Sequence, residues 1–278
     1  MEGNPRQQMP KLLSCILFAT LTASLGAQTP PPVLPPTLPS QATTIDDVVV
    51  PIPSEIFAAL DKFSDSNWRA VRRQGLTQLK PHGDQTEIAL LLGAVIAEGF
   101  VAVKAEDTAE VKSVGRTVVI LARGLGVERA ALRRSRSIIE HAEQGDWPAV
   151  RKEWDGVLPD VERGMRDLKS EQLAQLVSLS GWLRGTQVLS TLVLQNYSPE
   201  NAALLRQRPL LDHFERQLAT MKGGLRKRTL LSDMRDGIRK IQMLVASNDA
   251  QISKETVKEI ASVAEELLKD LISKGGNR

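Results

Sequence analysis

Two long segments of this chain each contain a single charged residue. Between residues 88 and 103 the only charge is Glu98, and between residues 172 and 199 the only charge is Arg184. In both segments the apolar residues cover every side of a helix, and such a helix belongs at the centre of a packed domain rather than on its surface. These two segments therefore predict the interior around which the rest of the chain folds.

Helical periodicity runs through almost all of residues 54–278. The sequence therefore predicts an all-α domain, a multi-helix bundle of about eight or nine helices around two central apolar helices at about 85–105 and 172–196. Polar residues that typically begin helices precede several of the periodic runs: Asn67, Asp84, Thr108, Asp146, Ser170, Ser198 and Ser253. Pro159 is expected to interrupt or kink the helix that begins at Asp146.

The first 27 residues have the pattern of a secretory signal peptide. Arg6 and Lys11 form a positive region, residues 12–25 are mostly apolar, and Gly26 and Ala27 offer a small-residue cleavage site. This pattern predicts that the protein is exported and works in the periplasm or outside the cell.

Cys15 is the only cysteine and lies inside the apolar part of this segment. Cleavage would leave a cysteine-free mature chain, which excludes disulfides and cysteine chemistry. Two alternatives remain: a lipidated Cys15, although the apolar stretch follows it rather than precedes it, and an uncleaved anchor. The apolar stretch is shorter than the roughly 20 residues of a membrane span, which argues against the uncleaved anchor. We expect no transmembrane span in the mature chain.

Residues 28–53 contain eight prolines and form a predicted linker. Proline lacks the N–H that a helix needs and favours extended chain, so this segment is either a semi-rigid spacer or a tail with no role of its own. Residues 48–50, three consecutive valines, could add a short strand.

The charge balance gives little support for a polyanionic partner. The 36 Lys and Arg lose Arg6 and Lys11 on cleavage, the 33 Asp and Glu lose Glu2, and the mature net charge becomes +2. The whole chain has ten aromatic residues. Stacked rings are common in sugar-binding and single-strand nucleic-acid sites, so no nucleic-acid partner is expected.

Glu98 and Arg184 are the sharpest candidate pair, because a buried charge is costly unless it is paired and hydrogen-bonded. We expect the two apolar helices to pack side by side, with Gly93 and Gly181 among the small residues that permit close approach, and these two charges to meet. In the alternative, each charge reaches the surface or has another partner, such as Arg116 for Glu98.

A second candidate is a set of basic residues around a double-glycine turn. The interpretation without a binding role is a solvated face whose charges are neutralised by acids of neighbouring helices. The functional interpretation is contact with an anionic surface such as lipid headgroups. The set comprises Lys222, Arg226, Lys227, Arg228, Arg235, Arg239 and Lys240.

No catalytic or metal constellation is recognisable in the sequence. His82, His141 and His213 are far apart and stand in none of the spacings that zinc or di-metal sites use. Nucleotide-binding glycine loops and a nucleophile elbow are absent as well. We therefore predict no catalytic residue, no metal and no cofactor, and an enzyme is the less favoured class.

Three functions remain open at this stage. The first is a non-enzymatic structural or interaction protein of the periplasm or envelope, with an unknown protein or envelope component as its partner. The second is a helical binding module for an apolar small molecule or lipid, which a deep apolar cavity would favour. The third is an enzyme whose site is assembled from residues distant in sequence, which a cleft gathering ionisable residues would favour.

Overall fold

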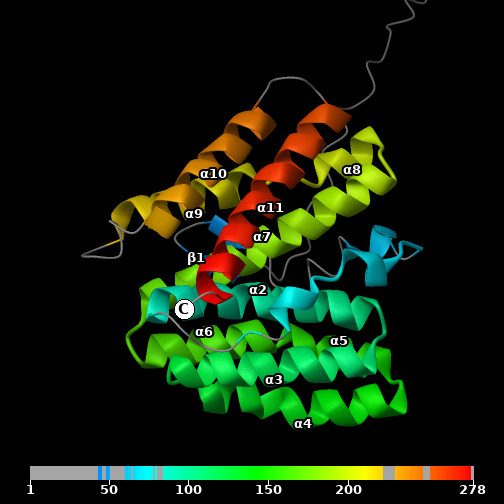
Figure 1. The fold of residues 1–278 in the computed structure, drawn as a ribbon, viewed down its shortest axis with the longest axis vertical. Coiled ribbons are helices and arrows are strands. Elements are labelled where there is room, and N and C mark those ends of the chain that lie inside the picture. Colours follow the sequence, from blue (N-terminus) through cyan, green and yellow to red (C-terminus); the bar gives the residue numbers. More distant parts are fainter. Residues whose placement is uncertain are drawn as a thin grey trace, which may run out of the picture. The chain divides into compact units, whose positions relative to one another are not determined.

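Helices make up most of the described part of this protein (Figure 1). The computed structural model describes residues 43–45, 48–50, 60–63, 65–77, 79, 84–221, 229–246 and 251–276. The α-helices are α2 (Gln85–Lys104), α3 (Thr108–Gly124), α4 (Glu128–Gln144), α5 (Trp147–Asp155), α6 (Val157–Asp167), α7 (Glu171–Gln195), α8 (Pro199–Ala203), α9 (Arg208–Thr220), α10 (Thr229–Ala246) and α11 (Lys254–Gly276). The all-α class is confirmed, and the helices are close in number to the eight or nine expected.

Shorter elements precede α2. The 3-10 helices η1 (Asp61–Phe63), η2 (Trp68–Val71) and η3 (Gln74–Leu76) connect to it, and strands β1 (Thr43–Ile45) and β2 (Val48–Val50) pair antiparallel. The short strand anticipated at residues 48–50 is therefore present as β2. The expected signal peptide and the rest of the linker lie outside the described residues, so those interpretations remain predictions.

Helices α2 and α7 form the centre of the fold, as their composition predicts. They share the most extensive contact between any two described helices, and every residue of α2 from Ile88 to Val103 is buried. A Cβ added at Gly93 would overlap the backbone carbonyl of Val177, and one added at Gly181 would lie 3.3 Å from the carbonyl oxygen of Gly93. The glycines thus let the two backbones approach more closely than larger residues allow.

Helix α2 is also long and apolar enough to cross a membrane by length and composition alone. However, 94% of its most apolar window is buried inside the protein. A core helix meets the same criteria, and the packing of α2 against α7, α3 and α11 accounts for its composition.

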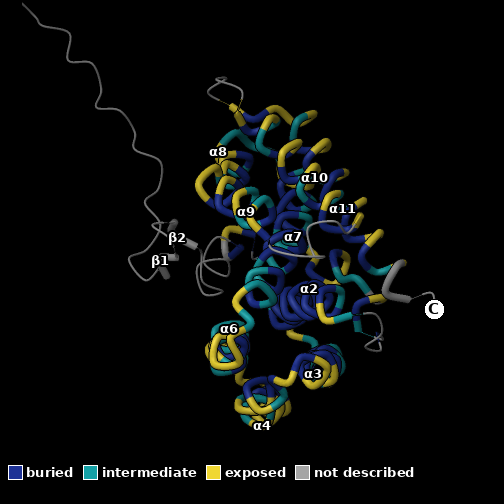
Figure 2. The backbone as a smooth tube through the Cα atoms, turned by 90° about the vertical axis from the view of Figure 1, so that its left-hand side faces the viewer, coloured by how far each residue is buried: buried dark blue, intermediate teal, exposed yellow. Residues whose placement is uncertain are grey.

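The remaining helices pack on the central pair or on one another. Helix α3 packs on α2, α4 packs on α3 and α5, α6 packs on α7, and α11 lies along α7 beside α10 (Figure 1). In Figure 2, α3, α4 and α6 are seen nearly end-on, with their buried sides turned inward and their exposed sides outward. This arrangement leaves the α3–α4 hairpin with one face toward solvent.

Several helices begin at the capping residues that the sequence indicates. The Asp84 carboxylate accepts the backbone N–H groups of Thr86 and Glu87, and the caps Asn67, Asp146, Ser198 and Ser253 each accept one backbone N–H in the same way. Such caps satisfy amides that have no partner within the helix.

Three local predictions need correction. Helix α3 is capped by Asp107, because the expected cap, Thr108, donates its hydroxyl to the carbonyl of Ala142 instead. Ser170 makes no side-chain cap to α7. Pro159 does not interrupt a helix: the break comes earlier, at Gly156, and Pro159 lies in the first turn of α6, where its missing N–H costs nothing.

Candidate functional site

An apolar pocket opens between α3 and α4 and extends to the side chains of α5 and α6 behind them. Its volume is about 310 Å³. Apart from Arg116, Ser135 and the indole nitrogen of Trp154, the described lining residues carry no polar side-chain group. The lining residues are Val111, Gly115, Arg116, Val118, Val119, Ile120, Ala131, Leu132, Ser135, Ile138, Ile139, Trp154 and Val157. We call this the α3–α4 pocket.

Small residues in the two helices account for the opening. Gly115 of α3 and Ser135 of α4 both line the pocket, and a Cβ added at Gly115 would meet no atom within 4 Å. Trp154 and Val157, both buried, line it from α5 and α6. The indole N–H of Trp154 donates to the carbonyl oxygen of Ile96 at 3.1 Å, so this lining side chain is held in place by the central helix α2.

Large apolar side chains surround the mouth of the pocket. Ile120, Leu132 and Ile139 are 40%, 45% and 36% exposed, and they are three of the five exposed large apolar residues in the described part of the chain. Single exposed apolar residues are ordinary, but their concentration at one opening is typical of a binding surface. Ile120, Leu132 and Ile139 lie outside the sets of buried residues on α3 and α4. Their positions on the two helices could have indicated an exposed apolar surface, but the sequence analysis did not identify it.

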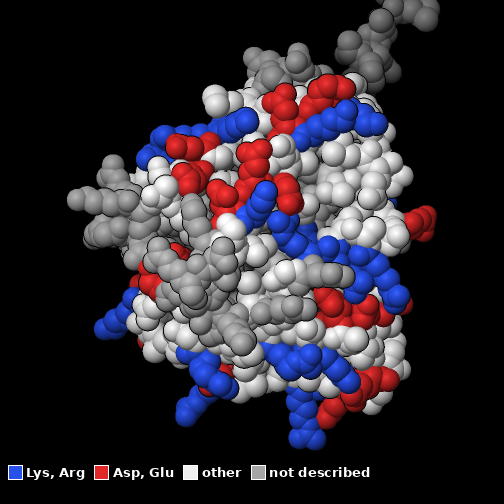
Figure 3. Space-filling view, in the orientation of Figure 1, with Lys and Arg blue, Asp and Glu red and all other residues white. Residues whose placement is uncertain are grey.

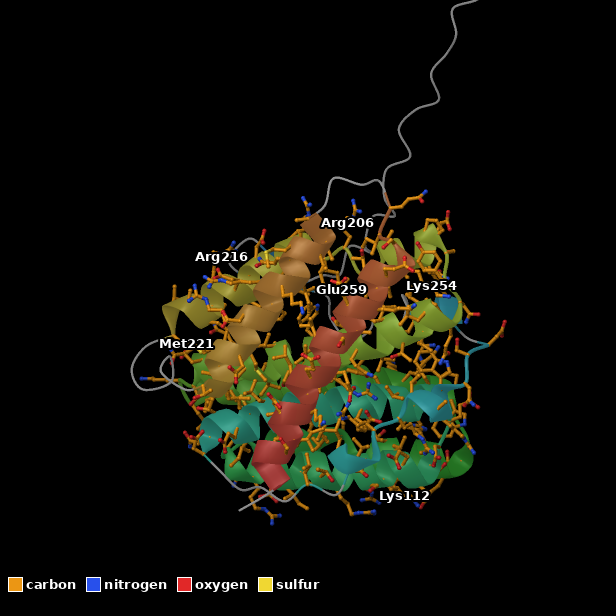
Figure 4. All side chains as sticks on the ribbon, turned by 45° about the horizontal axis from the view of Figure 1, so that its top comes forward. Lys112, Arg206, Arg216, Met221, Lys254 and Glu259 are labelled. Carbon is orange, nitrogen blue, oxygen red and sulfur yellow. The ribbon has the colours of Figure 1, made fainter. Side chains whose placement is uncertain are left out.

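Ion pairs lie at both ends of the same hairpin. Lys112 of α3 pairs with Glu143 of α4 at one end, and Arg123 pairs with Glu128 at the other. Lys112 is labelled at the lower edge of the molecule in Figure 4. The apolar mouth therefore lies between two charged ends.

Asp155, beside the lining residue Trp154, has an unusual environment. Its Oδ1 atom is buried and has no hydrogen-bond partner among the described residues. Burial raises the pKa of Asp155 from 3.8 to about 6, and the positive charge of Arg151 only partly opposes this shift. A raised carboxyl pKa means that folding favours the protonated form, so ionisation of this group weakens the fold.

Replacing Asp155 with asparagine is expected to stabilise the protein in a pH-dependent way. The destabilising effect of the carboxylate is absent below about pH 4, grows as the pH rises through the folded pKa of about 6, and is complete above it. The stability gain of Asp155→Asn should therefore increase between pH 4 and pH 7, as measured by urea unfolding. Asp167→Asn, at an exposed position of α6, is the control, and an equal gain at every pH would contradict the prediction.

The structure brings Glu98 and Arg184 together in the centre of the fold. Their exposed side-chain fractions are 0% and 1%. Arg184 donates from Nε to Glu98 Oε2 at 2.8 Å, and its Nη2 lies 2.7 Å from the same oxygen in an ion pair. Burial lowers the pKa of Arg184, while the Glu98 carboxylate opposes that effect. Arg116, the alternative partner for Glu98, lies at the α3–α4 pocket instead.

The backbone of the segment before α2 completes this buried pair. The backbone N–H of Arg73 donates to Glu98 Oε1 at 2.7 Å, and Arg184 Nη2 donates to the carbonyl oxygen of Val71 at 2.6 Å. The remaining guanidinium nitrogen donates to the side chain of Gln187. Both charges are thus hydrogen-bonded within the protein, which fits a structural role in holding α2, α7 and the preceding segment together.

Part of the predicted basic set is neutralised by α9. Arg235 and Arg239 of α10 both donate to Glu215, and the hydrogen bond from Arg235 lowers the pKa of Glu215. Lys240 is exposed on the same helix, while Lys222, Arg226, Lys227 and Arg228 lie outside the described residues. On the face shown in Figure 3, basic and acidic side chains alternate rather than gather in one basic area.

The histidines are dispersed in the structure as in the sequence. His213 is buried beside Phe214, His141 lies 3.6 Å from Asp146, and His82 lies outside the described residues. Within the described ranges, no group of three or more His, Cys, Asp or Glu side chains could hold a metal ion.

Comparison with known proteins gives no family. No protein-family model matches the chain, and no curated protein or solved structure matches it significantly. Any function must therefore be argued from the site itself.

Proposed function

We propose that this chain is a non-enzymatic, exported helical protein that binds the apolar part of a small molecule or lipid in the α3–α4 pocket. The observation that carries the proposal is the pocket itself: about 310 Å³ of space lined almost entirely by apolar side chains and open to solvent. Ligand sites in proteins are typically concave, mostly apolar and largely pre-formed.

The size of the pocket supports a small occupant. Its volume of about 310 Å³ lies at the lower end of the usual range for ligand pockets, roughly 300–1,000 Å³. It is about twice the roughly 150 Å³ of an engineered apolar cavity that binds benzene. One hydrocarbon chain or one small ring system matches this space, whereas a lipid with two chains needs more.

The exposed residues at the mouth supply a driving force for binding. Covering Ile120, Leu132 and Ile139 with a ligand removes apolar surface from water, at about 25 cal/mol per Å². The pocket keeps its shape because Trp154 is hydrogen-bonded to α2 and needs no rearrangement to receive a ligand. Pre-formed sites avoid part of the entropy cost of binding.

Export to the periplasm or envelope is the second part of the proposal, supported by the pattern of residues 1–27 and the proline-rich linker after them. The first test is native mass spectrometry of the protein purified from its own envelope fraction. A mature chain lacking the first 27 residues, with one small molecule bound, is the expected result. A full-length chain found only inside the cell would overturn the export proposal.

Filling the pocket should abolish ligand retention without unfolding the protein. Gly115→Leu places a side chain where an added Cβ meets no neighbour, inside the lining of the pocket. We expect this variant to lose the bound molecule in native mass spectrometry while its thermal unfolding midpoint stays at or above that of the parent, because leucine favours helix more than glycine does.

Gly185→Leu is the matched control. Gly185 also lies within a helix, α7, and a Cβ there also meets no atom within 4 Å, but it does not line the pocket. It should retain the ligand. Retention by Gly115→Leu, or equal loss by both variants, would contradict the assignment of the site to the α3–α4 pocket.

A second candidate function uses the same surface. Ile120, Leu132 and Ile139 could be covered by a partner protein of the envelope rather than by a small molecule, since exposed apolar patches also mark protein interfaces. The test is whether the ligand-free chain migrates in a defined complex and becomes monomeric when Leu132 is replaced by glutamine. That result would favour binding of a partner protein over binding of a small molecule.

A further inference from the structure

Among the described residues that line the α3–α4 pocket, Arg116 is the one cation. It follows Gly115 on α3, its side chain is exposed, and it makes no hydrogen bond or ion pair with any described residue. Several other cations of the hairpin are already paired: Lys112 with Glu143, and Arg136 with Glu140. Arg116 therefore has an unused set of donors beside an apolar space.

The other polar lining groups are already engaged. The Ser135 hydroxyl donates to the carbonyl oxygen of Leu132 at 2.9 Å, and the Trp154 indole donates to Ile96. Within the described lining, a polar end of a ligand would therefore find its charged donor at Arg116. A guanidinium presents paired N–H groups that match a carboxylate.

We infer that the α3–α4 pocket takes a single-chain carboxylate amphiphile, a fatty acid anion, with its hydrocarbon chain in the pocket and its carboxylate on Arg116. This inference rests on the proposed function and specifies its ligand. One positive charge in the lining matches one negative charge on the ligand, and a volume of about 310 Å³ matches one chain rather than two.

Two probes that differ only in their polar end test the inference. These are 12-bromododecanoate and 12-bromododecanol, used at pH 8, where the carboxylate is ionised. Bromine quenches tryptophan fluorescence on contact, and Trp154 is the tryptophan in the pocket lining. Dissociation constants for both probes follow from the quenching of the full mature chain.

Arg116→Gln is the test variant, and Arg129→Gln is its matched control. Arg129 lies on the same hairpin, is exposed, and has no ion pair among the described residues, but it does not line the pocket. Arg116→Gln should weaken bromododecanoate binding about tenfold, the lower end of the range for a lost hydrogen bond to a charged group because Arg116 is exposed, and should leave bromododecanol binding unchanged. Arg129→Gln should change neither.

The outcomes separate this inference from the proposed function. If neither probe binds the parent protein, or Gly115→Leu leaves their quenching intact, apolar binding in this pocket is wrong. If both probes bind in the pocket but Arg116→Gln changes neither or weakens both equally, the carboxylate contact is wrong while the binding function stands. Displacement of bromododecanoate by vesicles of a two-chain anionic phospholipid, but not by dodecanoate, would also overturn the fatty acid assignment.

Discussion

Replacing Glu98 with glutamine is expected to remove about 3–5 kcal/mol from the free energy of unfolding, because it leaves the buried Arg184 guanidinium without a compensating charge. Both side chains are shielded from solvent, and each makes further hydrogen bonds within the protein. Urea denaturation, followed by circular dichroism at 222 nm, measures the loss. A change below about 1 kcal/mol, the range of a surface pair, would contradict the burial of the pair.

A double-mutant cycle separates the interaction energy between Glu98 and Arg184 from the other contacts that each side chain makes. Arg184→Met should be destabilising by a similar amount, and the double variant Glu98→Gln with Arg184→Met should lose less than the sum of the two, because neither charge is then left alone. Glu143→Gln, which breaks the more exposed pair with Lys112, is the matched control and should cost less than about 1 kcal/mol.

Replacing Gly93 with alanine should be strongly destabilising, with a loss of about 3 kcal/mol in the free energy of unfolding. The added Cβ would overlap the Val177 carbonyl and the Ser180 hydroxyl of α7. A backbone carbonyl within a helix cannot rotate away, so α2 and α7 must separate to admit the methyl group.

Two other helical glycines provide the control for this effect. An added Cβ at Gly115 or Gly185 meets no atom within 4 Å. Gly115→Ala and Gly185→Ala should therefore raise stability by about 0.5–1 kcal/mol through helix propensity alone. Thermal and urea unfolding of the three variants measure the expected loss of stability at Gly93 and the expected gains at Gly115 and Gly185. A Gly93→Ala variant as stable as the parent would contradict the prediction, because it would mean that α2 and α7 separate at little cost.

Composition was sufficient to identify the central helices. One charge in a long apolar run identifies both the burial of a helix and the residue that needs a partner, so α2, α7, Glu98 and Arg184 could all be singled out from the sequence. The caps Asp84 and Asp146 were equally readable, because capping depends on a few residues adjacent in the chain.

The pocket could not be predicted in the same way. Whether two neighbouring helices close against each other depends on the distance between their axes, and no local pattern encodes that distance. Gly115 and Ser135 are ordinary helix residues until they are known to line one pocket. The hydrogen bonds between the backbone of Val71 and Arg73 and the buried pair could not be predicted either, because all residue types except proline carry the same backbone groups.

The hydrogen bonds from Val71 and Arg73 to the buried pair determine where the smallest independent folding unit of this chain can begin. A fragment starting at the first residue of α2 would keep the helices α2 to α11, yet Glu98 would lose an amide donor and Arg184 a carbonyl acceptor. The segment before α2 is therefore part of the core in energetic terms, although the helices described between Asp61 and Leu76 are short 3-10 helices. Domain boundaries drawn for expression or fusion must lie before Trp68.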